Sequence, residues 1–551
     1  MSMITTTRWV PRGYAAQFPT KYAMDDEEMD RIGELAKLKL EDAQNDLADA
    51  ENGSDEEEED NEEQEEKGSK VPTTANADEM DEDDKKFANI PGSPRPINYN
   101  DDDLKEYDLE HYDDEDNTGE GEAMAMFGNV KSLAYYNSNK DDPYITLKDE
   151  HANDEEDDED REELQILKTD NLILAASVED DLAQLEVYVY EDAADNMYVH
   201  HDIMLPAIPL CLEWLDYPVN KADVNVSQAA NFVAVGTMDP DIEIWDLDAV
   251  DSTYPNAILG QGSDPTLAKE KKKKKKAKKA NDEYHTDAVL SLSHNRQHRN
   301  LLASASADKT IKLWDLNTTK CAKSYSYHTD KVCSLAWHPT EATVLLSGSY
   351  DRTVVASDMR APDAKAPRWG VESDVENVRW DPHDPNYFYV STENGILHYH
   401  DVRNAPATPA ATKPVWTLQA HDESLSSFDI NPVIPGFIAT GSSDKTVKLW
   451  NIQASGPSMV VSRNLDVGKV FSTAFAPDSE VAFRLAVAGS AGSLQVWDTS
   501  TNAAVRKAFA GRVPEGSAEK EDRMVGIADE SDSESDDDDE DEEKDDSMDE
   551  D

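Results

Sequence analysis

Residues 285–315 read HTDAVLSLSHNRQHRNLLASASADKTIKLWD, and this stretch contains the outline of a small β-sheet. Residues 288–292 and 301–306 are rich in apolar and β-branched side chains, which is typical of strands. After the second of these strands, residues 307–310 predict a tight turn in which Asp308 accepts hydrogen bonds from the backbone. Residues 310–315 alternate apolar and polar side chains, and a more polar fourth strand is expected around 320–326. Four strands in about 43 residues make a sheet that cannot bury both faces alone.

The same pattern recurs along the chain at fixed offsets. The third strand ends near Trp245, Trp314, Trp450 and Trp497, with Ser357 and His400 in the same place in two further repeats. A histidine precedes the repeat at His285, His328 and His421, and a turn aspartate stands at Asp239, Asp308, Asp351 and Asp444. A period of about 40–45 residues is the spacing of propeller blades, which stack radially around an axis. The sequence therefore predicts an all-β, seven-bladed β-propeller. The expected blades are 164–200, 211–248, 285–320, 328–360, 371–403, 421–453 and 465–500.

This motif resembles the WD40 repeat family. The resemblance implies a hydrogen-bonded tetrad in each well-formed blade, made by a histidine, a serine or threonine, the turn aspartate and the tryptophan. The two complete tetrads would be His285, Ser304, Asp308, Trp314 and His421, Thr440, Asp444, Trp450. The blade with His328 has Ser357 in place of the tryptophan, so its tetrad is incomplete. These residues are expected to hold turns together and are assigned no chemistry.

Composition divides the chain into a folded middle and acidic flanks. The 551 residues contain 118 acidic and 52 basic side chains, a formal charge of −66, and most of this excess lies outside the repeats. Such segments bury too little apolar surface to offset the entropy of ordering, so they are expected to be disordered. The predicted boundaries are a docking segment at 1–50, an acidic linker at 51–122, the propeller at 123–510 and an acidic tail at 511–551. Within the propeller, 149–163 is an acidic loop, and 123–147 is a candidate for the strand that closes the ring.

A lysine run interrupts the propeller within a predicted insertion at 249–281. It comprises Lys271, Lys272, Lys273, Lys274, Lys275, Lys276, Lys278 and Lys279. Like charges at this density repel one another and prevent compact folding. A nuclear-targeting signal is the favoured interpretation, and direct RNA contact or a solvated loop remain open. In the acidic tail, Ser531, Ser533 and Ser535 resemble casein kinase 2 sites, where phosphorylation would add further negative charge.

The first 50 residues carry aromatic and apolar side chains that the acidic flanks lack. Trp9, Pro11 and Arg12 lie in a segment expected to be extended, and acidic residues from Asp25 predict the start of a helix. Ile32, Leu35 and Leu40 fall on one side of that helix at steps of three and four residues. We interpret these six residues as a docking element for a partner protein. The alternative is that the helix packs back on the propeller.

Motifs of catalysis and of membrane insertion do not occur in this sequence. It contains no P-loop, no nucleophile elbow, no His-Glu-x-x-His and no Cys-x-x-Cys, and its three cysteines are odd in number. His398 and His400 share a strand face, but no further ligands stand at a spacing suited to a metal. No apolar run is long enough to span a membrane. A non-enzyme without cofactor or metal is therefore expected.

The amino-terminal block gives a more specific resemblance than the repeats. Trp9-Val10-Pro11-Arg12-Gly13, followed by Pro19-Thr20-Lys21-Tyr22 and the acidic helix start, is similar to a family of nucleolar WD40 proteins. That resemblance implies a scaffold in assembly of the large (60S) ribosomal subunit and in processing of precursor rRNA. The implied partners are pre-60S assembly factors, ribosomal proteins and precursor rRNA, with direct contact to the RNA left open. The chain would be a monomer within a larger complex in the nucleus and nucleolus.

Two other functions remain open at this point. The first is a chromatin factor whose acidic tails shield histones and whose propeller reads a histone tail, which requires acidic and aromatic residues at the channel mouth. The second is a substrate adaptor for a ubiquitin ligase, although no second recruitment domain is seen. Four arginines have two interpretations, a basic rim for rRNA or surface salt bridges: Arg352, Arg360, Arg368 and Arg379.

Overall fold

The fold is described by a computed structural model. It describes residues 2–22, 29, 32–33, 164–180, 182–219, 230–260, 281–361 and 364–509, together with the backbone of 524–525. These residues belong to one of two compact units of the chain, which comprises Met1–Gln44 and Asp158–Asp551.

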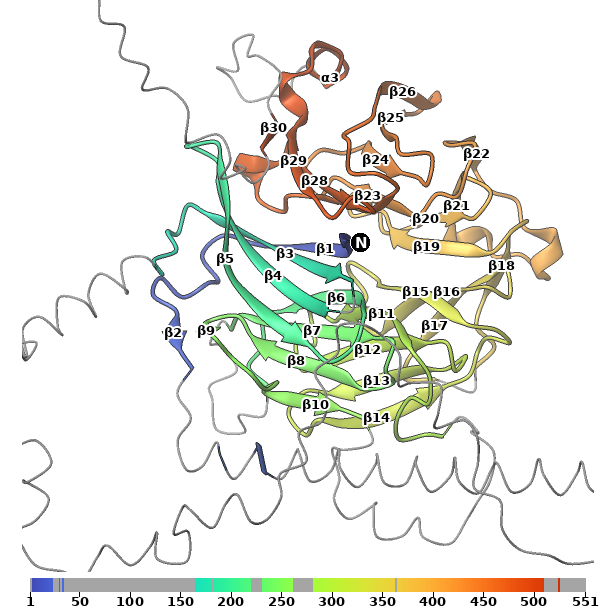
Figure 1. The fold of residues 1–551 in the computed structure, drawn as a ribbon. Coiled ribbons are helices and arrows are strands. Elements are labelled where there is room, and N and C mark those ends of the chain that lie inside the picture. Colours follow the sequence, from blue (N-terminus) through green and yellow to red (C-terminus); the bar gives the residue numbers. More distant parts are fainter. Residues whose placement is uncertain are drawn as a thin grey trace, which may run out of the picture. The chain divides into compact units, whose positions relative to one another are not determined.

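Seven antiparallel four-stranded sheets form a ring of blades around one axis (Figure 1). Blade 1 contains β1 (Ser2–Val10), β3 (Asn171–Glu179), β4 (Leu182–Glu191) and β5 (Asn196–Leu205), from the inner to the outer strand. Blade 2 contains β6 (Pro209–Leu215), β7 (Phe232–Thr237), β8 (Ile242–Asp246) and β10 (Ala257–Leu259). Blade 3 contains β11 (Val289–His294), β12 (Leu301–Ser306), β13 (Ile311–Asp315) and β14 (Lys320–Tyr325).

The remaining four blades repeat this order. Blade 4 contains β15 (Val332–Trp337), β16 (Val344–Ser349), β17 (Thr353–Asp358) and β18 (Arg368–Gly370). Blade 5 contains β19 (Val375–Trp380), β20 (Tyr387–Thr392), β21 (Ile396–Asp401) and β22 (Trp416–Gln419). Blade 6 contains β23 (Ser427–Ile430), β24 (Phe437–Gly441), β25 (Val447–Gln453) and β26 (Gly456–Arg463). Blade 7 contains β27 (Val470–Phe475), β28 (Arg484–Gly489), β29 (Leu494–Asp498) and β30 (Met524–Val525), with the short helix α3 (Ala503–Ala508) between the last two.

The predicted seven-bladed fold is confirmed, but three predicted boundaries are wrong. The strand that completes the first blade is β1, which pairs with β3 from Ser2↔Glu179 to Val10↔Leu172, and not a strand within 123–147, which lies outside the described residues. Residues 249–260 belong to the fold, because Ala257–Leu259 pairs with β8 as the outer strand of blade 2. The tail predicted at 511–551 contributes β30, which pairs with β29 at Trp497↔Met524.

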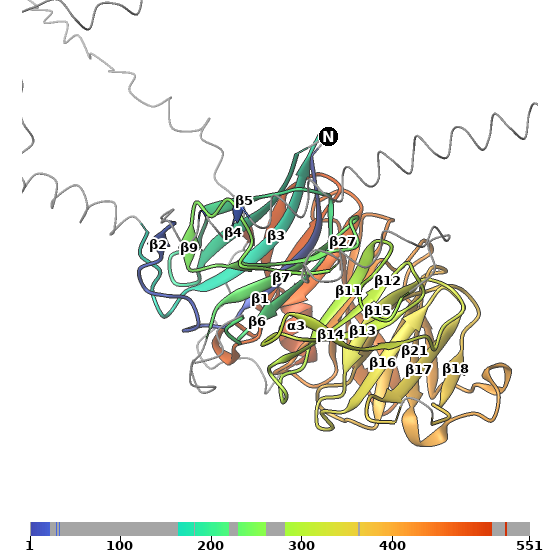
Figure 2. The ribbon, with the colours of Figure 1, turned by 90° about the horizontal axis from the view of Figure 1, so that it is seen from below.

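β1 lies beside β3 in both views of the ribbon and takes the place of an inner strand (Figures 1 and 2). Neighbouring inner strands are joined by a hydroxyl that accepts a hydrogen bond from a backbone N–H, as at Leu335 N to Ser291 Oγ, 3.2 Å. Thr7 N donates in the same way to Ser472 Oγ of blade 7, at 3.1 Å. Because β1 makes this bond to the last blade while it pairs within the first, it closes the ring and covers the inner edge of β3.

A tryptophan side chain repeats the same linkage at three places in the ring, buried at Trp9 and Trp380 and half-buried at Trp337. The indole Nε1 of Trp337 donates to Ser293 O, and that of Trp380 donates to Ala336 O. Trp9 Nε1 donates to Ala474 O at 2.9 Å, and the Trp9 ring packs edge-on against Tyr190 with centroids 5.8 Å apart. On the other side of β1, Arg8 forms an ion pair of 2.7 Å with the buried Glu213 of β6. The first ten residues therefore bridge three blades.

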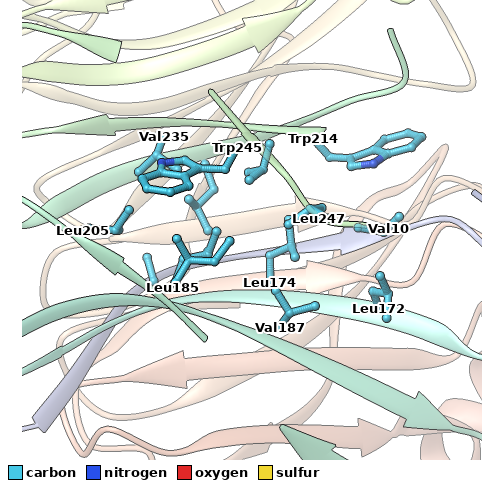
Figure 3. Packing of buried hydrophobic residues seen from close by; sticks show 14 of the residues in the cluster. Val10, Leu172, Leu174, Leu185, Val187, Leu205, Trp214, Val235, Trp245 and Leu247 are labelled. Carbon is cyan, nitrogen blue, oxygen red and sulfur yellow. The ribbon is translucent and has the colours of Figure 1, made fainter. Parts of the chain in front are cut away.

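The hydrophobic core lies between adjacent blades. Figure 3 shows this packing between blades 1 and 2, where Leu174, Leu185 and Val187 face Trp245 and Leu247. Val10 at the end of β1 belongs to the same buried cluster. Each blade thus buries both faces against its neighbours, which a single four-stranded sheet cannot do alone.

Residues 11–22 follow β1 as a strap along blades 1 and 2. Ala16 N donates to the carboxylate of Asp248 at 3.0 Å, and Ile166 N donates to Gln17 O at 3.0 Å. β2 (Thr20–Lys21) then pairs in parallel with β9 (Ala249–Val250), and the two lie side by side in Figures 1 and 2. The amino-terminal segment is therefore part of the propeller through Tyr22, whose backbone N–H bonds to Val250 O.

A glycine in blade 7 provides a test of how closely β1 is packed. Gly492 has φ +75°, and a Cβ at this position would lie 1.9 Å from Ser2 Oγ. Gly13 has a similar φ of +78°, but no described atom lies within 4 Å of its Cβ position. Gly13→Ala is expected to cost about 1 kcal/mol of unfolding free energy through the backbone alone. Gly492→Ala should cost clearly more, measured by denaturant unfolding, because the methyl group must also displace β1; equal losses would contradict this packing.

Candidate interaction surfaces

The two predicted tetrads are brought together by the turns that join the second and third strands of blades 3 and 6. His285 Nδ1 lies 2.9 Å from Asp308 Oδ2, and its Nε2 lies 2.6 Å from Ser304 Oγ. Trp314 Nε1 donates to the same hydroxyl at 2.8 Å. In blade 6 the corresponding distances for His421, Asp444, Thr440 and Trp450 are 2.8, 2.8 and 2.9 Å.

The electrostatics of the blade 3 tetrad indicate a structural role. Burial lowers the pKa of His285 despite the neighbouring carboxylate, which keeps the imidazole neutral. Burial alone would raise the pKa of Asp308, but hydrogen bonds from His285 and Thr310 outweigh it and hold the pKa at about 2. Neither side chain is accessible to a substrate, since their exposed fractions are 0% and 2%. The tetrad therefore fixes the turn geometry and binds nothing.

Ser304→Ala is expected to lower the free energy of unfolding by about 2 kcal/mol, because two buried hydrogen bonds are lost: the Ser304 hydroxyl donates to Nε2 of the neutral His285 and accepts from Trp314 Nε1. Ser347→Ala in blade 4 is the matched control. There the serine hydroxyl lies 2.9 Å from His328 Nε2, and Ser357 stands where the tryptophan would donate. One hydrogen bond to a buried side chain is lost instead of two, so a cost of about 1 kcal/mol is expected. Denaturant unfolding of both variants checks the order, and a larger loss for Ser347→Ala would contradict it.

Blade 5 differs most from the repeat. His400 occupies the tryptophan position, since it pairs with Phe388 on β20, and its ring stacks on that phenylalanine with centroids 5.2 Å apart. His400 is buried, and so is His398 on the same strand. Within the described residues no group of three or more His, Cys, Asp or Glu side chains could hold a metal ion.

The docking assignment of the amino-terminal residues needs correction. Trp9 is buried at 5% exposure in the ring closure. Pro11 follows β1 directly, and Arg12 Nε donates to Asn171 Oδ1 at 2.7 Å while its backbone N–H bonds to Asp478. The side chains of Trp9 and Arg12 are thus engaged within the propeller, whereas Pro11 is half-buried and its docking role stays a prediction. The pattern of residues 2–10 alone does not reveal these contacts, because the partners of β1 lie about 160 and 470 positions further along the chain.

The other predicted sites fall largely outside the described residues. Ile32 is helical, as are Met29 and Gly33, whereas Leu35 and Leu40 are not described. The lysines at 271–276, 278 and 279 and the serines at 531, 533 and 535 are not described either. The chain leaves blade 2 at Leu259 and is described again from Asn281, whose side chain accepts from the backbone N–H of Glu283 and Tyr284. The lysine run is thus attached between blades 2 and 3.

The four arginines proposed as a basic rim each pair with a carboxylate. The pairs are Arg352–Asp374 at 3.1 Å, Arg360–Asp358 at 2.7 Å, Arg368–Asp351 at 3.7 Å and Arg379–Asp429 at 3.2 Å. Arg368 also donates to Tyr327 O. The salt-bridge interpretation is therefore the one that the structure supports.

An acidic site that the sequence did not reveal lies at the start of the inner strand β19. Glu376 stands at the irregular pairing between Val375 and Asn377, and Asp374 and Glu393 are close enough to act on its charge. Burial, together with these two carboxylates, raises the pKa of Glu376 to about 7. Tyr350, 36% exposed, lies within the influence of the same group. These residues come from three different turns or strands, so no motif signals them.

The ring of seven four-stranded sheets, with sealed tetrads in the turns, defines a WD40-type β-propeller, a class of protein-interaction scaffolds. The WD domain, G-beta repeat family matches residues 280–315, 319–355 and 412–451. No helix within the described residues is long and apolar enough to cross a membrane.

Three relatives resemble the chain over most of its length. An uncharacterized WD repeat-containing protein of Schizosaccharomyces pombe is 50% identical, covering 96% of this chain and 95% of that protein. Periodic tryptophan protein 1 of Saccharomyces cerevisiae is 39% identical, covering 92% and 90%. The periodic tryptophan protein 1 homolog of Drosophila melanogaster is 31% identical, covering 84% and 86%. The chain belongs to the periodic tryptophan protein 1 family, and this membership is consistent with a non-catalytic WD-repeat protein.

Proposed function

We propose that this chain is a non-catalytic scaffold in assembly of the large (60S) ribosomal subunit and in processing of precursor rRNA. The observation that carries the proposal is family membership over nearly the whole chain. The amino-terminal block resembles nucleolar WD40 assembly factors, and here it forms the strand that closes the ring. The proposed partners are pre-60S assembly factors, ribosomal proteins and precursor rRNA, and the proposed location is the nucleus and nucleolus.

A closed propeller suits this role for a physical reason. Every sheet buries its faces on its neighbours, so the turns and the outer strands remain as binding surfaces on a rigid body. Functional sites on rigid elements hold several partners in fixed relative positions. The lysine run between blades 2 and 3 supplies the positive charge for nuclear import or for phosphate contacts.

A tagged pull-down from growing cells, with RNA and protein analysed before and after a high-salt wash, tests the proposal. We expect large-subunit precursor rRNA and ribosomal proteins in the bound fraction. Core histones without precursor rRNA would overturn it. Replacing the lysines at 271–276, 278 and 279 with glutamine should abolish nucleolar accumulation of a fluorescent fusion. Repeating the pull-down with this variant in cell extract, where no import is needed, separates nuclear targeting from partner binding.

Histone binding is the second candidate function, and the acidic site around Glu376 favours it. Glu376 and Glu393 with the half-exposed Tyr350 offer the acidic and aromatic side chains that a reader of a basic tail requires, beside Asp374, which is paired with Arg352. In that case Glu376→Gln should weaken binding of a histone-tail peptide to the purified full-length protein. The substitution should leave recovery of precursor rRNA unchanged if the assembly proposal holds.

A further inference from the structure

A column of stacked planar side chains crosses the outer half of blade 5. Tyr387 of β20 stacks on Tyr399 of β21, with ring centroids 4.9 Å apart and an angle of 9° between the rings. Tyr399 stacks in turn on Trp416 of β22, at 5.1 Å and 22°. At the inner end of the column, the guanidinium of Arg403 lies 5.4 Å from the centroid of Tyr387. All three rings are half-buried, so each keeps part of its surface in contact with solvent.

The outer end of this column has no further ring. β22 is the outermost strand of blade 5 and the farthest from the axis in Figure 1, so no strand of the blade continues the stack beyond Trp416. Within the part of the chain that the structure describes, the indole of Trp416 makes ring contacts with Tyr389 and Tyr399 alone. One more planar group can therefore stack on its outward face, at the spacing that the column already has.

Trp416 differs from the other tryptophans of this chain. Eight of the ten are buried, and the half-buried Trp337 donates its indole N–H to Ser293 O at 2.9 Å. Trp416 is half-buried as well, but its indole N–H bonds to no atom of the described residues. A tryptophan with an accessible ring and an N–H donor suits an interface, where the N–H usually finds an acceptor.

The segment around Trp416 carries no negative charge. Residues 402–421 contain no aspartate or glutamate, in a chain with 118 acidic side chains. Lys413 lies three positions before Trp416, is exposed, and has no carboxylate partner among the described residues. The local charge is therefore positive in an otherwise acidic protein, which favours a partner that carries negative charge.

The carboxylates at the tyrosine end of the column are already engaged. Asp401 pairs with Arg403 at 2.8 Å. Asp381 accepts the hydroxyl groups of two tyrosines, at 3.3 and 3.4 Å, and Asp384 accepts from the side chain of Asn386 at 2.8 Å. A phosphate beside the tryptophan would thus meet an unpaired lysine, and the carboxylates of this blade have partners of their own.

We propose that the outward face of Trp416 is a stacking site for an unpaired base of RNA. This inference rests on the proposed role in precursor rRNA processing and names one contact between the protein and that RNA. A base stacked on the indole would extend the column by one plane, and Lys413 would contact a phosphate of the same strand. The indole N–H would donate to an oxygen of the nucleotide. A base inside a duplex cannot stack there, because its two faces are covered by its neighbours.

Photo-crosslinking of the purified full-length protein to a synthetic RNA tests the proposal. The probe is an oligouridine of about twelve nucleotides with one 5-iodouridine at its centre, a length within the span of single-strand sites. Irradiation joins 5-iodouridine to an aromatic ring on which it stacks, and mass spectrometry identifies that ring. We expect Trp416 to be the principal crosslinked residue. The yield should fall about tenfold when the probe is first annealed to oligoadenosine, because its bases are then paired.

The affinity of variants for the same RNA gives a second measurement. Trp416→Ala should weaken binding about tenfold through loss of one base–aromatic stack, whereas Trp416→Phe should stay within about threefold of the parent because a ring face remains. Lys413→Ala should lower the slope of log affinity against log salt by about 0.7, the contribution of one phosphate contact on a single strand. Lys469→Ala is the matched control, an exposed lysine before β27 of blade 7, and it should leave the slope unchanged.

Three results would overturn the proposal. The first is a principal crosslink at another residue, and the second is equal RNA affinity of Trp416→Ala and the parent protein. The third is a Trp416→Ala variant that binds the RNA normally but loses a protein from the pull-down, which would assign the indole to a protein partner. Denaturant unfolding shows whether the variants are folded, and the crosslink in the unmodified protein decides the case if Trp416→Ala is not.

Failure of this site is distinguishable from failure of the proposed function. The crosslinking uses purified protein and a synthetic RNA, so it does not depend on ribosome assembly. Loss of precursor rRNA from the pull-down with a retained crosslink at Trp416 would overturn the assembly role alone. Recovery of precursor rRNA without a crosslink at Trp416 would overturn the stacking site alone.

Discussion

Trp9→Ala is expected to lower the free energy of unfolding by about 3–5 kcal/mol, the cost of truncating a large buried aromatic side chain. The indole is 5% exposed, contacts Tyr190 and donates a hydrogen bond to Ala474 O. Its loss leaves a cavity between the first and last blades, at the contact that closes the ring. Denaturant unfolding monitored by circular dichroism measures the effect.

A docking role for Trp9 would give a different result. If the indole served only a partner, Trp9→Ala would leave unfolding unchanged and reduce partner recovery, and that outcome would contradict the closure assigned here. Met459→Ala is the control, because this side chain is 59% exposed on an outer strand and its truncation should change stability little. Trp9→Phe should recover most of the loss, since the ring remains and one hydrogen bond of about 1 kcal/mol is removed.

Acidification from pH 7 to pH 5 is expected to remove about 4 kcal/mol of stability through His201 and His400 alone, about 2 kcal/mol from each. Burial, with a smaller effect of His200, lowers the pKa of His201 to about 4. Burial and then His398 lower the pKa of His400 to about 3. In the unfolded chain both titrate near their ordinary value of 6.5. The unfolded state therefore takes up protons first as pH falls, so stability is full above about pH 6.5 and declines below it.

The variant His201→Phe with His400→Phe isolates this contribution. Its stability should fall by about 4 kcal/mol less than that of the parent protein between pH 7 and pH 5. His298→Asn is the control, because this histidine is exposed and its replacement should leave the dependence unchanged. Equal pH dependence in the double variant and the parent, measured by urea unfolding at the two pH values, would show that other groups govern acid unfolding.

The repeat could be predicted because its hydrogen bonds are local. His285, Ser304, Asp308 and Trp314 lie within one blade, and the distances that join them follow from two short turns. The same offsets recur at His421, so the order of the strands within these blades could be predicted from the spacing of the motif residues. The arginines show the limit of this approach, because Arg379 pairs with Asp429 in the next blade, a partner that spacing does not reveal.

The first blade could not be predicted in the same way. Residues 2–10 carry no histidine, turn aspartate or tryptophan at the offsets of the repeat, so they read as an isolated extended segment. Trp9 was assigned to a partner for this reason, and a strand nearer to the blade was expected to close the ring. The acidic site at Glu376 is a similar case, because Asp374, Glu393 and Tyr350 are brought to it by separate turns.

The sequence by itself determined the number of blades, the tetrads and the distribution of charge, because each depends on residues close together in the chain. Only the tertiary structure decided which strand closes the ring and which side chains surround Glu376. Pairing of β1 with β3 joins segments separated by about 160 residues, and it is selected by the burial of Trp9 and Val10 and by the covering of the inner edge of β3. Such a choice is made by the assembled ring and by no local pattern.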